Sequence, residues 1–421
     1  FVTSSLQQDA SSKLRFSAKR TMQVAQTLYE NGLITYMRTD STSLAPEAIT
    51  AIRNLITSEY GAEYLSPSVR TYQTKVKNAQ EAHEAIRPSG ERFVHPDEVK
   101  AKFGDEAFKL YDLIWKRTVA CQMADSKGER VSVGLKIEDN LFRAGGKTIT
   151  FPGYLRAYAE VTEDAEVDMT DRETILPPLS EGKSLKPTDI KSKARKTEPP
   201  ARYTEGTLIK ELEGRGIGRP STWASVVETV LSREYAFKKG TALVPTVTGM
   251  LVVDLLQTNF SSFLDYEFTA KLEDELDSIS RGELDSLKYL SSFYHGDGHS
   301  GLKQLASKGI ESIDRSDACA LVISDSDDQE EQRKIEVRVG RYGPFITDGV
   351  LRASLPPDIT PEELTVDKAN EILRAAAKGG DALGYDPVTS KPVFVKTGRF
   401  GPYVQLGEKD DSGDKPKLAS L

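Results

Sequence analysis

The sequence predicts a multidomain protein of the α+β class. The chain has 421 residues, which is long for a single hydrophobic core. Apolar residues recur at helical spacing near the start and in the middle of the chain, and they alternate with polar residues between these parts. A short motif near the C-terminus occurs twice. Helices and strands that are segregated along the chain in this way are typical of α+β proteins.

Residues 1–127 are predicted to form a helical domain. Ser17 is a candidate N-cap, apolar residues follow it at helical spacing, and Gly32 ends the pattern. Leu33–Met37 is rich in β-branched and aromatic residues, which predicts a short strand. Further helices are expected at 46–60 and 105–124.

Residues 128–200 are predicted to form a β-rich arch domain. Apolar residues alternate with polar ones over 131–137, which is the pattern of a half-buried strand. Residues 201–300 return to helical spacing and are predicted to form a second helical domain. Within it, two helices flank the Gly-rich turn 214–220, and a Lys-Lys-Gly turn follows at 238–240. This order resembles a winged helix-turn-helix.

The C-terminal part contains an internal repeat. Residues 339–346 recur as 397–404 with the shared order Gly, Arg, aromatic, Gly, Pro, aromatic, which indicates tandem small units. We expect two repeats within 318–407, a polar linker before them at 301–317 and a charged, disordered tail after them at 408–421. The repeats offer two candidate DNA-contacting pairs, Arg341 with Tyr342 and Arg399 with Phe400.

Composition limits the possible classes of protein. The net charge of −8 argues by itself against a nucleic-acid partner, but clusters on the surface matter more than the total charge. Cys121, predicted to be buried, and Cys319 are too few for a four-cysteine zinc site, and we expect no disulfide between them. No apolar run approaches the roughly 20 residues of a membrane helix. The chain begins with Phe1 rather than Met, so we expect a piece of a longer, soluble cytoplasmic protein.

The segment 33–42 is the first candidate for chemistry. Tyr36 and Arg38 have the same strand parity and are expected to face one cleft. Arg38 can bind the nonbridging oxygens of a phosphate and stabilise a Tyr36 phenolate. These are the needs of a tyrosine nucleophile that attacks a phosphodiester. By pattern alone, a tyrosine in a β core followed by helix-capping residues is the more common explanation.

The segment 81–88 is the second candidate. His83 is of a type that contacts phosphate or relays a proton, and Glu84 follows it. The pair suggests the zinc signature His-Glu-x-x-His, but Arg87 occupies the position of the second histidine, so no zinc site is predicted. A helix end with solvated charges, stopped by Pro88, explains the pattern equally well.

The Gly-rich turn 214–223 is the third candidate. Its two arginines and the N-terminus of the following helix suit a DNA phosphate. It lacks the Lys-Ser/Thr ending of a P-loop, so no ATP site is predicted. A plain turn between packed helices is the more common explanation by pattern alone. The candidate DNA-binding residues of this turn are Arg215, Arg219, Ser221, Thr222 and Trp223.

These three segments, in this order, resemble bacterial type IA DNA topoisomerases. The opening residues 1–8 and the stretch 268–273 resemble that family as well, so the resemblance covers roughly 1–293. The terminal repeats resemble the repeated C-terminal units of some members, notably actinobacterial ones.

The resemblance implies a torus in which a winged-helix-like domain, which carries the tyrosine, lifts away so that a strand can pass through a break. Tyr36 would form a 5′-phosphotyrosine link, Arg38 would position the scissile phosphate, and His83 would assist there. Arg219 would hold single-stranded DNA at the entrance. Thr39, Asp40, Ser41, Glu84 and Arg87 would support the site.

The implied activity is the ATP-independent relaxation of negatively supercoiled DNA by transient cleavage of one strand, strand passage and religation. Its partner would be DNA, both single-stranded and as a negatively supercoiled duplex, and we expect a nucleoid-associated monomer that does not bind membranes. Whether the C-terminal repeats contact DNA or a partner such as RNA polymerase stays open.

The sequence departs from the family in three respects. The family begins with a Toprim domain whose carboxylates bind Mg²⁺, and no Asp-x-Asp-x-Glu motif occurs in this chain. We therefore expect the chain alone to bind DNA without relaxing it. Many members also carry four-cysteine zinc ribbons, which two cysteines cannot form. Trp223 stands where the family usually has Tyr; a tryptophan can still stack on a base.

Three alternatives compete with this expectation. A non-catalytic DNA-binding or scaffold protein that kept the fold is the main alternative. A tyrosine recombinase or type IB enzyme is disfavoured because its Tyr follows several Arg and His residues, whereas Tyr36 comes first here. A reverse gyrase is disfavoured because no helicase or nucleotide motif is present.

Overall fold

The structure is a computed structural model, and it divides into two compact units. The first unit comprises Phe1–Thr229, Gly240–Ala242 and Ala270–Asp277, and the second comprises Val230–Lys239, Leu243–Thr269 and Ser278–Leu421. The residues that the structure describes are 1–72, 84–158, 179–189, 191–298, 300–314, 320–324, 334–340, 343–356, 359–377, 383–398, 401–407 and 417–420.

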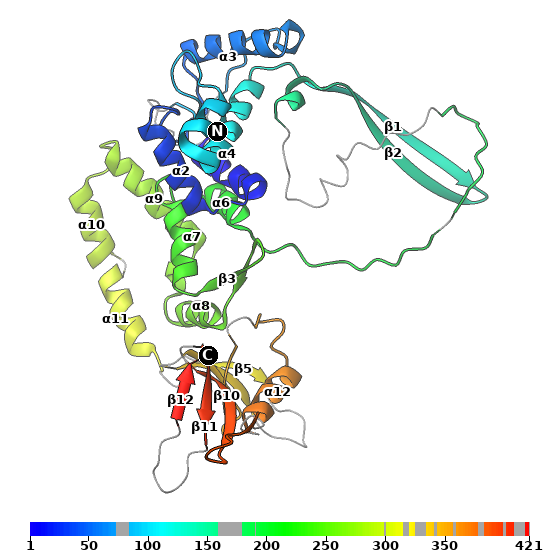
Figure 1. Cartoon of the computed structure of the whole chain (residues 1–421). Helices are drawn as coiled ribbons and strands as arrows, with labels where there is room; N and C mark the ends of the chain where they lie inside the picture. The colour runs from blue at the N-terminus through cyan, green and yellow to red at the C-terminus, as the bar shows by residue number, and fades with distance from the viewer. Residues whose placement is uncertain are drawn as a thin grey trace. The chain divides into compact units, whose positions relative to one another are not determined.

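The first unit is built on helices around one hydrophobic core (Figure 1). The largest fully buried side chains of this core include Leu6, Leu28, Ile52, Tyr111 and Ile114. They recur at helical spacing, so each helix turns one apolar stripe inward. The helical elements of the unit are α1 (Thr3–Asp9), η1 (Ala10–Leu14), α2 (Ala18–Glu30), α3 (Pro46–Glu59), η2 (Ala62–Tyr64), α4 (Pro96–Ala120), η3 (Gly153–Arg156), α6 (Glu205–Gly214), most of α7 (Trp223–Ser232) and the middle of α9 (Tyr266–Ser280).

The helices predicted in the first part of the chain are confirmed. The Ser17 side chain accepts a hydrogen bond from the backbone N–H of Arg20 and so caps α2. Helix α4 begins earlier than predicted, at Pro96, because His95 caps it and proline is favoured at the first helical position. It is kinked at Gly104, where φ is 81°.

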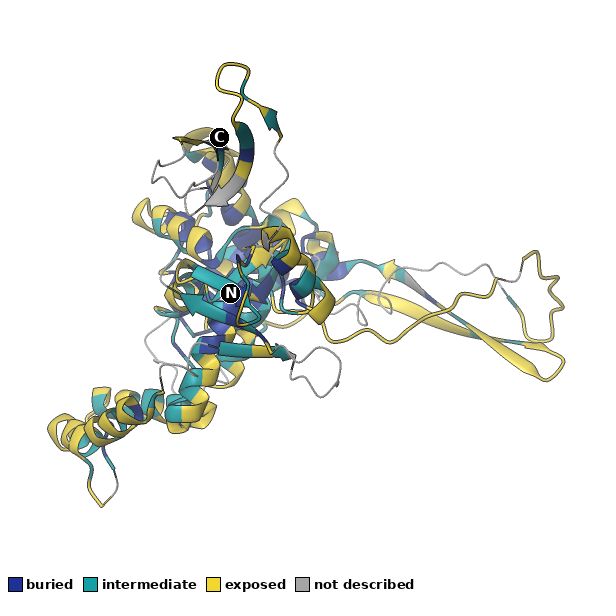
Figure 2. Cartoon of the chain, turned by 90° about the horizontal axis from the view of Figure 1, so that it is seen from below, coloured by how far each residue is buried: buried dark blue, intermediate teal, exposed yellow. Residues whose placement is uncertain are grey.

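Two predictions on strands were wrong. Leu33–Met37 forms no strand, and only an isolated bridge between Ile34 and Pro88 is present. The hairpin of β1 (Lys127–Ile137) and β2 (Asn140–Phe151) confirms the predicted strand, but β1 is not half-buried. Its residues are exposed on both faces (Figure 2), because no second layer of the described chain covers the hairpin.

The winged-helix order of elements is present in the middle of the chain. Helices α6 and α7 are followed by the two-stranded sheet of β3 (Ala236–Lys239) and β4 (Ala242–Pro245), and then by α8 (Val247–Asn259). The predicted linker contains a helix, α11, which its polar, Gly-rich composition did not indicate. The remaining helical elements before the repeats are η4 (Ser261–Phe263), α9 (Tyr266–Ser280), α10 (Ser286–His295) and α11 (Leu302–Ser312).

The C-terminal part contains two four-stranded antiparallel sheets with the orders β5-β6-β7-β8 and β12-β11-β10-β9. The repeated motif lies in equivalent hairpins, with Gly340 paired to Gly343 and Gly398 paired to Gly401. The elements are β5 (Ala320–Ser324), β6 (Ile335–Gly340), β7 (Gly343–Thr347), β8 (Arg352–Ser354), α12 (Val366–Ala377), β9 (Gly384–Tyr385), β10 (Pro392–Gly398), β11 (Gly401–Leu406) and β12 (Lys417–Ser420).

The prediction of a disordered tail was wrong for its last residues. Strand β12 pairs with β11, with Ala419 opposite Val404, so the charged end of the chain completes the second sheet. The remainder of the predicted tail, 408–416 and 421, lies outside the described residues, as do Arg341, Tyr342, Arg399 and Phe400. Within the part of the chain that the structure describes, no helix has the length and apolarity needed to cross a bilayer.

Candidate active site

Tyr36 lies on the loop that follows α2 and is 42% exposed. Its neighbours alternate in burial: Met37 and Thr39 are buried, whereas Arg38 is exposed. The loop therefore exposes both the phenol and the guanidinium to solvent, although no strand is formed. That the two side chains face one cleft stays a prediction. A tyrosine of a β core is excluded by this exposure.

Thr3, on the first turn of α1, holds one side of this loop. Its hydroxyl accepts a hydrogen bond from the Thr39 N–H at 2.9 Å and lies 2.8 Å from the Met37 carbonyl oxygen, to which it donates. The Thr3 N–H also donates to the Thr39 carbonyl oxygen at 3.0 Å. Because Thr3 and Thr39 are both buried, these bonds fix the backbone on either side of Arg38.

Thr35 holds the other side of the loop against residues 85–88. Its hydroxyl donates to the Ala85 carbonyl oxygen at 2.7 Å and accepts from the Arg87 N–H at 3.0 Å. The Thr35 N–H donates to the Arg87 carbonyl oxygen at 2.9 Å. These bonds bring the first and second candidate segments together, although 50 residues separate Thr35 from Ala85.

Glu84 and Arg87 form a bidentate ion pair beneath this junction. The Glu84 carboxylate accepts from the Arg87 Nε and Nη2 at 2.6 and 2.9 Å, and also from the Ala45 N–H at 2.8 Å. Arg87 is buried, so the expected alternative of a helix end with solvated charges is wrong. The pair connects the second segment to the start of α3. His83 lies outside the described residues.

The tyrosine ring has one aromatic neighbour among the described residues. Tyr29, from the last turn of α2, meets Tyr36 edge-to-face with ring centroids 5.2 Å apart. One turn earlier on the same helix, Gln26 donates to the Glu30 carboxylate at 2.6 Å. The contact between the Tyr29 and Tyr36 rings limits the orientations that the Tyr36 phenol can adopt.

The residues after Arg38 form a hydrogen-bonded turn. The Thr39 hydroxyl accepts from the Ser41 N–H at 3.0 Å, and the Ser41 hydroxyl accepts from the Ser43 N–H at 3.2 Å. Thr39 and Ser41 therefore support the loop through their own backbone, which is a local role of short hydroxyl side chains.

A second link joins α1 to α6, the helix that precedes the Gly-rich turn. The Ser4 hydroxyl donates to the Glu213 carboxylate at 2.6 Å. Burial raises the pKa of Glu213, the negative charge of Asp40 raises it further, and the Ser4 hydrogen bond opposes them. Gly206 allows α6 to approach α1 closely, since a Cβ there would lie 3.1 Å from the Cα of Gln8. Asp40 and Glu213 are thus neighbours, and the Tyr36 loop and the turn-bearing helix share one support.

The Gly-rich turn is held by its own side chains. The Thr222 hydroxyl accepts from the Arg219 N–H at 2.8 Å, and Gly216 and Gly218 have φ of 74° and 78°, where residues other than glycine are strained. Trp223 is only 4% exposed, and its indole N–H donates to the Ile217 carbonyl oxygen. The expectation that Trp223 stacks on a base is therefore wrong for this structure.

The other residues of the turn lie at its surface. Ser221 and Arg215 are exposed, and the Arg215 Nε donates to Glu211 at 2.6 Å. Arg219 is partly exposed and faces a carboxylate of α9. The Ser4–Glu213 and Thr3–Thr39 bonds were not predicted from the sequence, because no local pattern marks partners that are 209 and 36 residues away.

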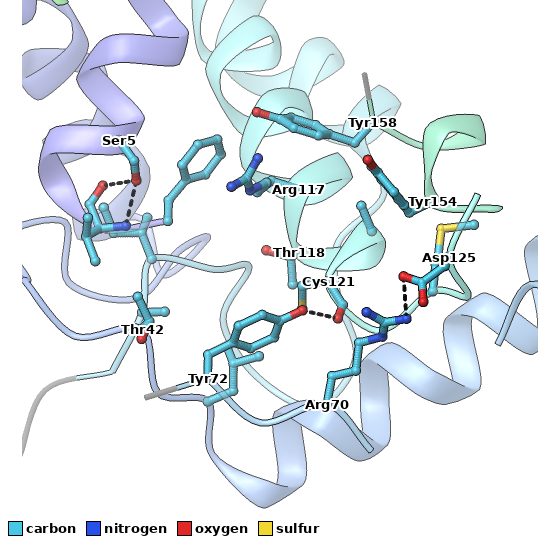
Figure 3. A pocket seen from close by; sticks show the side chains of 17 residues that line it. Ser5, Thr42, Arg70, Tyr72, Arg117, Thr118, Cys121, Asp125, Tyr154 and Tyr158 are labelled. Carbon is cyan, nitrogen blue, oxygen red and sulfur yellow. Dashed lines mark hydrogen bonds and ion pairs between the residues drawn. The ribbon is translucent and has the colours of Figure 1, made fainter. Parts of the chain in front are cut away.

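A separate cavity of about 320 Å³ lies beside the candidate site in the same unit (Figure 3). The Arg117 guanidinium lies 4.9 Å from the centre of the Tyr158 ring, and the Tyr72 hydroxyl donates to the Cys121 carbonyl oxygen. Desolvation raises the pKa of the Cys121 thiol to about 11. The residue was predicted to be buried, and it is only partly buried at the edge of the core. None of the sequence-predicted site residues that the structure describes lines this cavity.

The described residues do not fit a magnesium site on their own. Mg²⁺ prefers several oxygen ligands, usually carboxylates. No three Asp, Glu, His or Cys side chains of the described chain are grouped so that they could hold a metal ion.

Comparisons with known proteins agree with the geometry. Residues 1–291 match the DNA topoisomerase family, and residues 328–383 and 386–420 match the topoisomerase C-terminal repeat. DNA topoisomerase 1 of Streptomyces coelicolor is 48% identical over 456 residues, which cover all of this chain and 47% of that protein. DNA topoisomerase 1 of Synechocystis is 45% identical and is matched over 46% of its length by all of this chain.

A solved structure of a topoisomerase I is similar to this chain in fold. Full-length topoisomerase I from Thermotoga maritima is 34% identical and superimposes with a TM-score of 0.66, over 86% of this chain and 57% of that one. The chain spans about half the length of the curated relatives that it matches. The predicted fold, a mixed helix and sheet architecture of type IA topoisomerases with C-terminal repeats, is thus confirmed. The chain belongs to the bacterial type IA DNA topoisomerase family.

Proposed function

We propose that Tyr36 is the nucleophile of a DNA strand-cleavage reaction. Its phenolic oxygen attacks the phosphorus of a phosphodiester, a bond forms between them, and the bond from phosphorus to the 3′-oxygen breaks. The phenol loses its proton and the leaving 3′-oxygen gains one. One phosphodiester replaces another, so resealing by the reverse reaction requires no ATP.

The observation that carries this proposal is the exposed pair Tyr36 and Arg38 on a loop that is fixed from both sides. A nucleophile reacts fastest when it is already held in position before the substrate binds. Thr3 and Thr35 hold the backbone on either side, so the backbone that carries the phenol and the guanidinium keeps a fixed geometry. Arg38 then binds the nonbridging oxygens and stabilises the charge that develops on them.

For the whole protein, at the length of its relatives, we propose the relaxation of negatively supercoiled DNA by cleavage, strand passage and religation. We further propose that single-stranded DNA is held at the turn that carries Arg219, Ser221 and Thr222. Glu84 and Arg87 support the loop that carries Tyr36 through their hydrogen bonds to each other and to Ala45. Asp40 is proposed to support the site as well, and His83 is proposed to assist at the phosphate.

The test is covalent capture of DNA by the protein extended to the length of its relatives. A single-stranded oligonucleotide that is labelled at its 3′ end is incubated with enzyme and magnesium. The label then stays on the fragment whose new 5′-phosphate is attached to the protein, and adducts are separated under denaturing conditions. Tyr36→Phe should abolish the adduct. Tyr29→Phe is the matched control, because it also removes an exposed phenolic hydroxyl but keeps the ring, and it should retain the adduct. Undiminished capture by Tyr36→Phe would refute the assignment. A protein that binds the oligonucleotide but forms no adduct even with Tyr36 intact would favour the non-catalytic scaffold.

A further inference from the structure

The guanidinium of Arg219 faces an acidic side of α9 within the first unit. Its Nη2 lies 2.7 Å from the Asp277 carboxylate and 3.8 Å from that of Asp274, and its Nη1 lies 3.8 Å from the carboxylate of Glu273. We call these three residues the α9 carboxylates. One positive charge thus meets three negative charges.

The two terminal nitrogens of the guanidinium have different hydrogen-bond partners. Nη1 donates to the carbonyl oxygens of Gly218 and Gly216 at 2.8 and 3.3 Å, and so braces the turn from inside. The turn has little room to change, because a Cβ on Gly218 would lie 2.9 Å from the Trp223 ring. Nη2 and Nε are the donors left for an anion, and Nη2 already serves Asp277.

A DNA phosphate needs the same donors. Carboxylate and phosphate oxygens bind guanidinium in the same planar geometry, so both cannot use Nη2 fully at once. An incoming phosphate also meets the repulsion of the carboxylates that remain nearby. Both partners of the Arg219–Asp277 pair are partly exposed, with side chains 29% and 28% accessible, so the exchange does not require a buried charge to be left alone.

We propose that the α9 carboxylates compete with DNA phosphate for Arg219, and that Asp277 is the principal competitor. Helix α9 thereby sets the affinity of the Gly-rich turn for single-stranded DNA. This inference rests on the proposed function, in which that turn binds DNA.

The experiment measures binding of this chain to a fluorescein-labelled single-stranded oligonucleotide by anisotropy at low salt. Asp277→Asn keeps the shape and one acceptor but removes the charge, and it should tighten binding by roughly threefold to tenfold. Glu275→Gln is the matched control. It removes one charge from the same helix, where Glu275 lies 3.9 Å from Lys271, and it should change the affinity by less than about twofold.

A double mutant separates competition from a general gain in positive charge. Arg219→Ala should weaken binding, and Asp277→Asn added to Arg219→Ala should give no further gain, because the two residues act through one contact. Circular dichroism checks that each variant is folded. If Asp277→Asn is not, Glu273→Gln replaces it and should tighten binding in the same direction by a smaller factor.

The outcomes distinguish the two proposals. Absence of any single-stranded DNA binding by the unmodified chain would overturn the proposed function of the turn. Binding that Arg219→Ala weakens, but that Asp277→Asn leaves unchanged or weakens, would overturn the competition alone. An equal gain from Asp277→Asn and Glu275→Gln, or a gain that persists without Arg219, would overturn it as well.

Discussion

Replacement of Thr3 by valine tests how the loop that carries Tyr36 is held. Valine has nearly the same shape, so packing is conserved and only the hydroxyl is lost. The Thr39 N–H then loses the acceptor that lies 2.9 Å away, in a place where Thr39 is only 2% exposed. The Thr39 carbonyl oxygen keeps its bond from the Thr3 N–H. An unsatisfied buried donor, together with the lost bonds, costs about 2–3 kcal/mol in the free energy of unfolding.

The matched control is Thr21→Val. Thr21 is equally buried, but its hydroxyl only donates to the Ser17 carbonyl oxygen, which also accepts from the Thr21 N–H at 2.8 Å. No buried N–H loses its partner there, so the cost should be below about 1 kcal/mol.

Thermal unfolding followed by circular dichroism measures both variants. For a unit of this size each kcal/mol lowers the Tm by roughly 2–4 °C, so Thr3→Val should melt about 4–12 °C lower and Thr21→Val only slightly lower. In the protein extended to the length of its relatives, Thr3→Val should also reduce DNA capture more than DNA binding. Equal melting temperatures for Thr3→Val and Thr21→Val would refute the account of the unsatisfied Thr39 N–H.

Two further predictions follow from the ionisable groups of the first unit. The folded chain holds the Glu213 proton more tightly than the unfolded chain, because its pKa is raised by burial and by Asp40. Ionisation of Glu213 therefore lowers stability at pH above its raised pKa, and this effect disappears below the pKa of the unfolded chain. Glu213→Gln, which still accepts the Ser4 bond, should be more stable than the unmodified chain at neutral pH and should lose that advantage in acid. Denaturant titrations at several pH values measure the free energy of unfolding of both proteins. A difference in this free energy that does not change with pH would contradict the prediction. The Cys121 thiol, with its pKa raised to about 11 by burial, should react slowly with iodoacetamide at pH 8 in a Cys319→Ser background; mass spectrometry gives the rate, and a rate equal to that of an exposed thiol would contradict the assignment.

Elements with strong local signals were predicted from the sequence. Helix α2 shows apolar spacing between Ser17 and Gly32, and the structure begins and ends the helix beside these residues. The repeated motif predicted two tandem small units, and in the structure it lies in the equivalent hairpins β6–β7 and β10–β11. In each case the information lies within about 20 residues of sequence, so tertiary contacts are not needed to decide the local structure.

Features that depend on distant partners were not predicted. The composition of Leu33–Met37 indicates an extended backbone, but a strand needs a partner, and only the Ile34–Pro88 bridge is available. Trp223 was expected to be able to stack on a base, yet it is buried and donates to the Ile217 carbonyl oxygen. The carboxylates around Arg219 belong to α9, which follows the Gly-rich turn only after α7, β3, β4 and α8. The local pattern specifies none of these contacts.

The two neighbouring hydroxyls on α1 also have a consequence for the order of folding. The Ser4–Glu213 bond joins residues that are 209 positions apart, and the Ala18–Glu205 bond joins residues that are 187 apart. Contacts of such large sequence separation form late, because a long loop must close before they can form. A nascent chain that has not yet reached α6 therefore holds the Tyr36 loop by local contacts and by the bonds of Thr3 and Thr35, without the bonds that join α1 and α2 to α6. Helix α1, which supports this loop, receives its last contacts when the helix that leads into the Gly-rich turn has been synthesised.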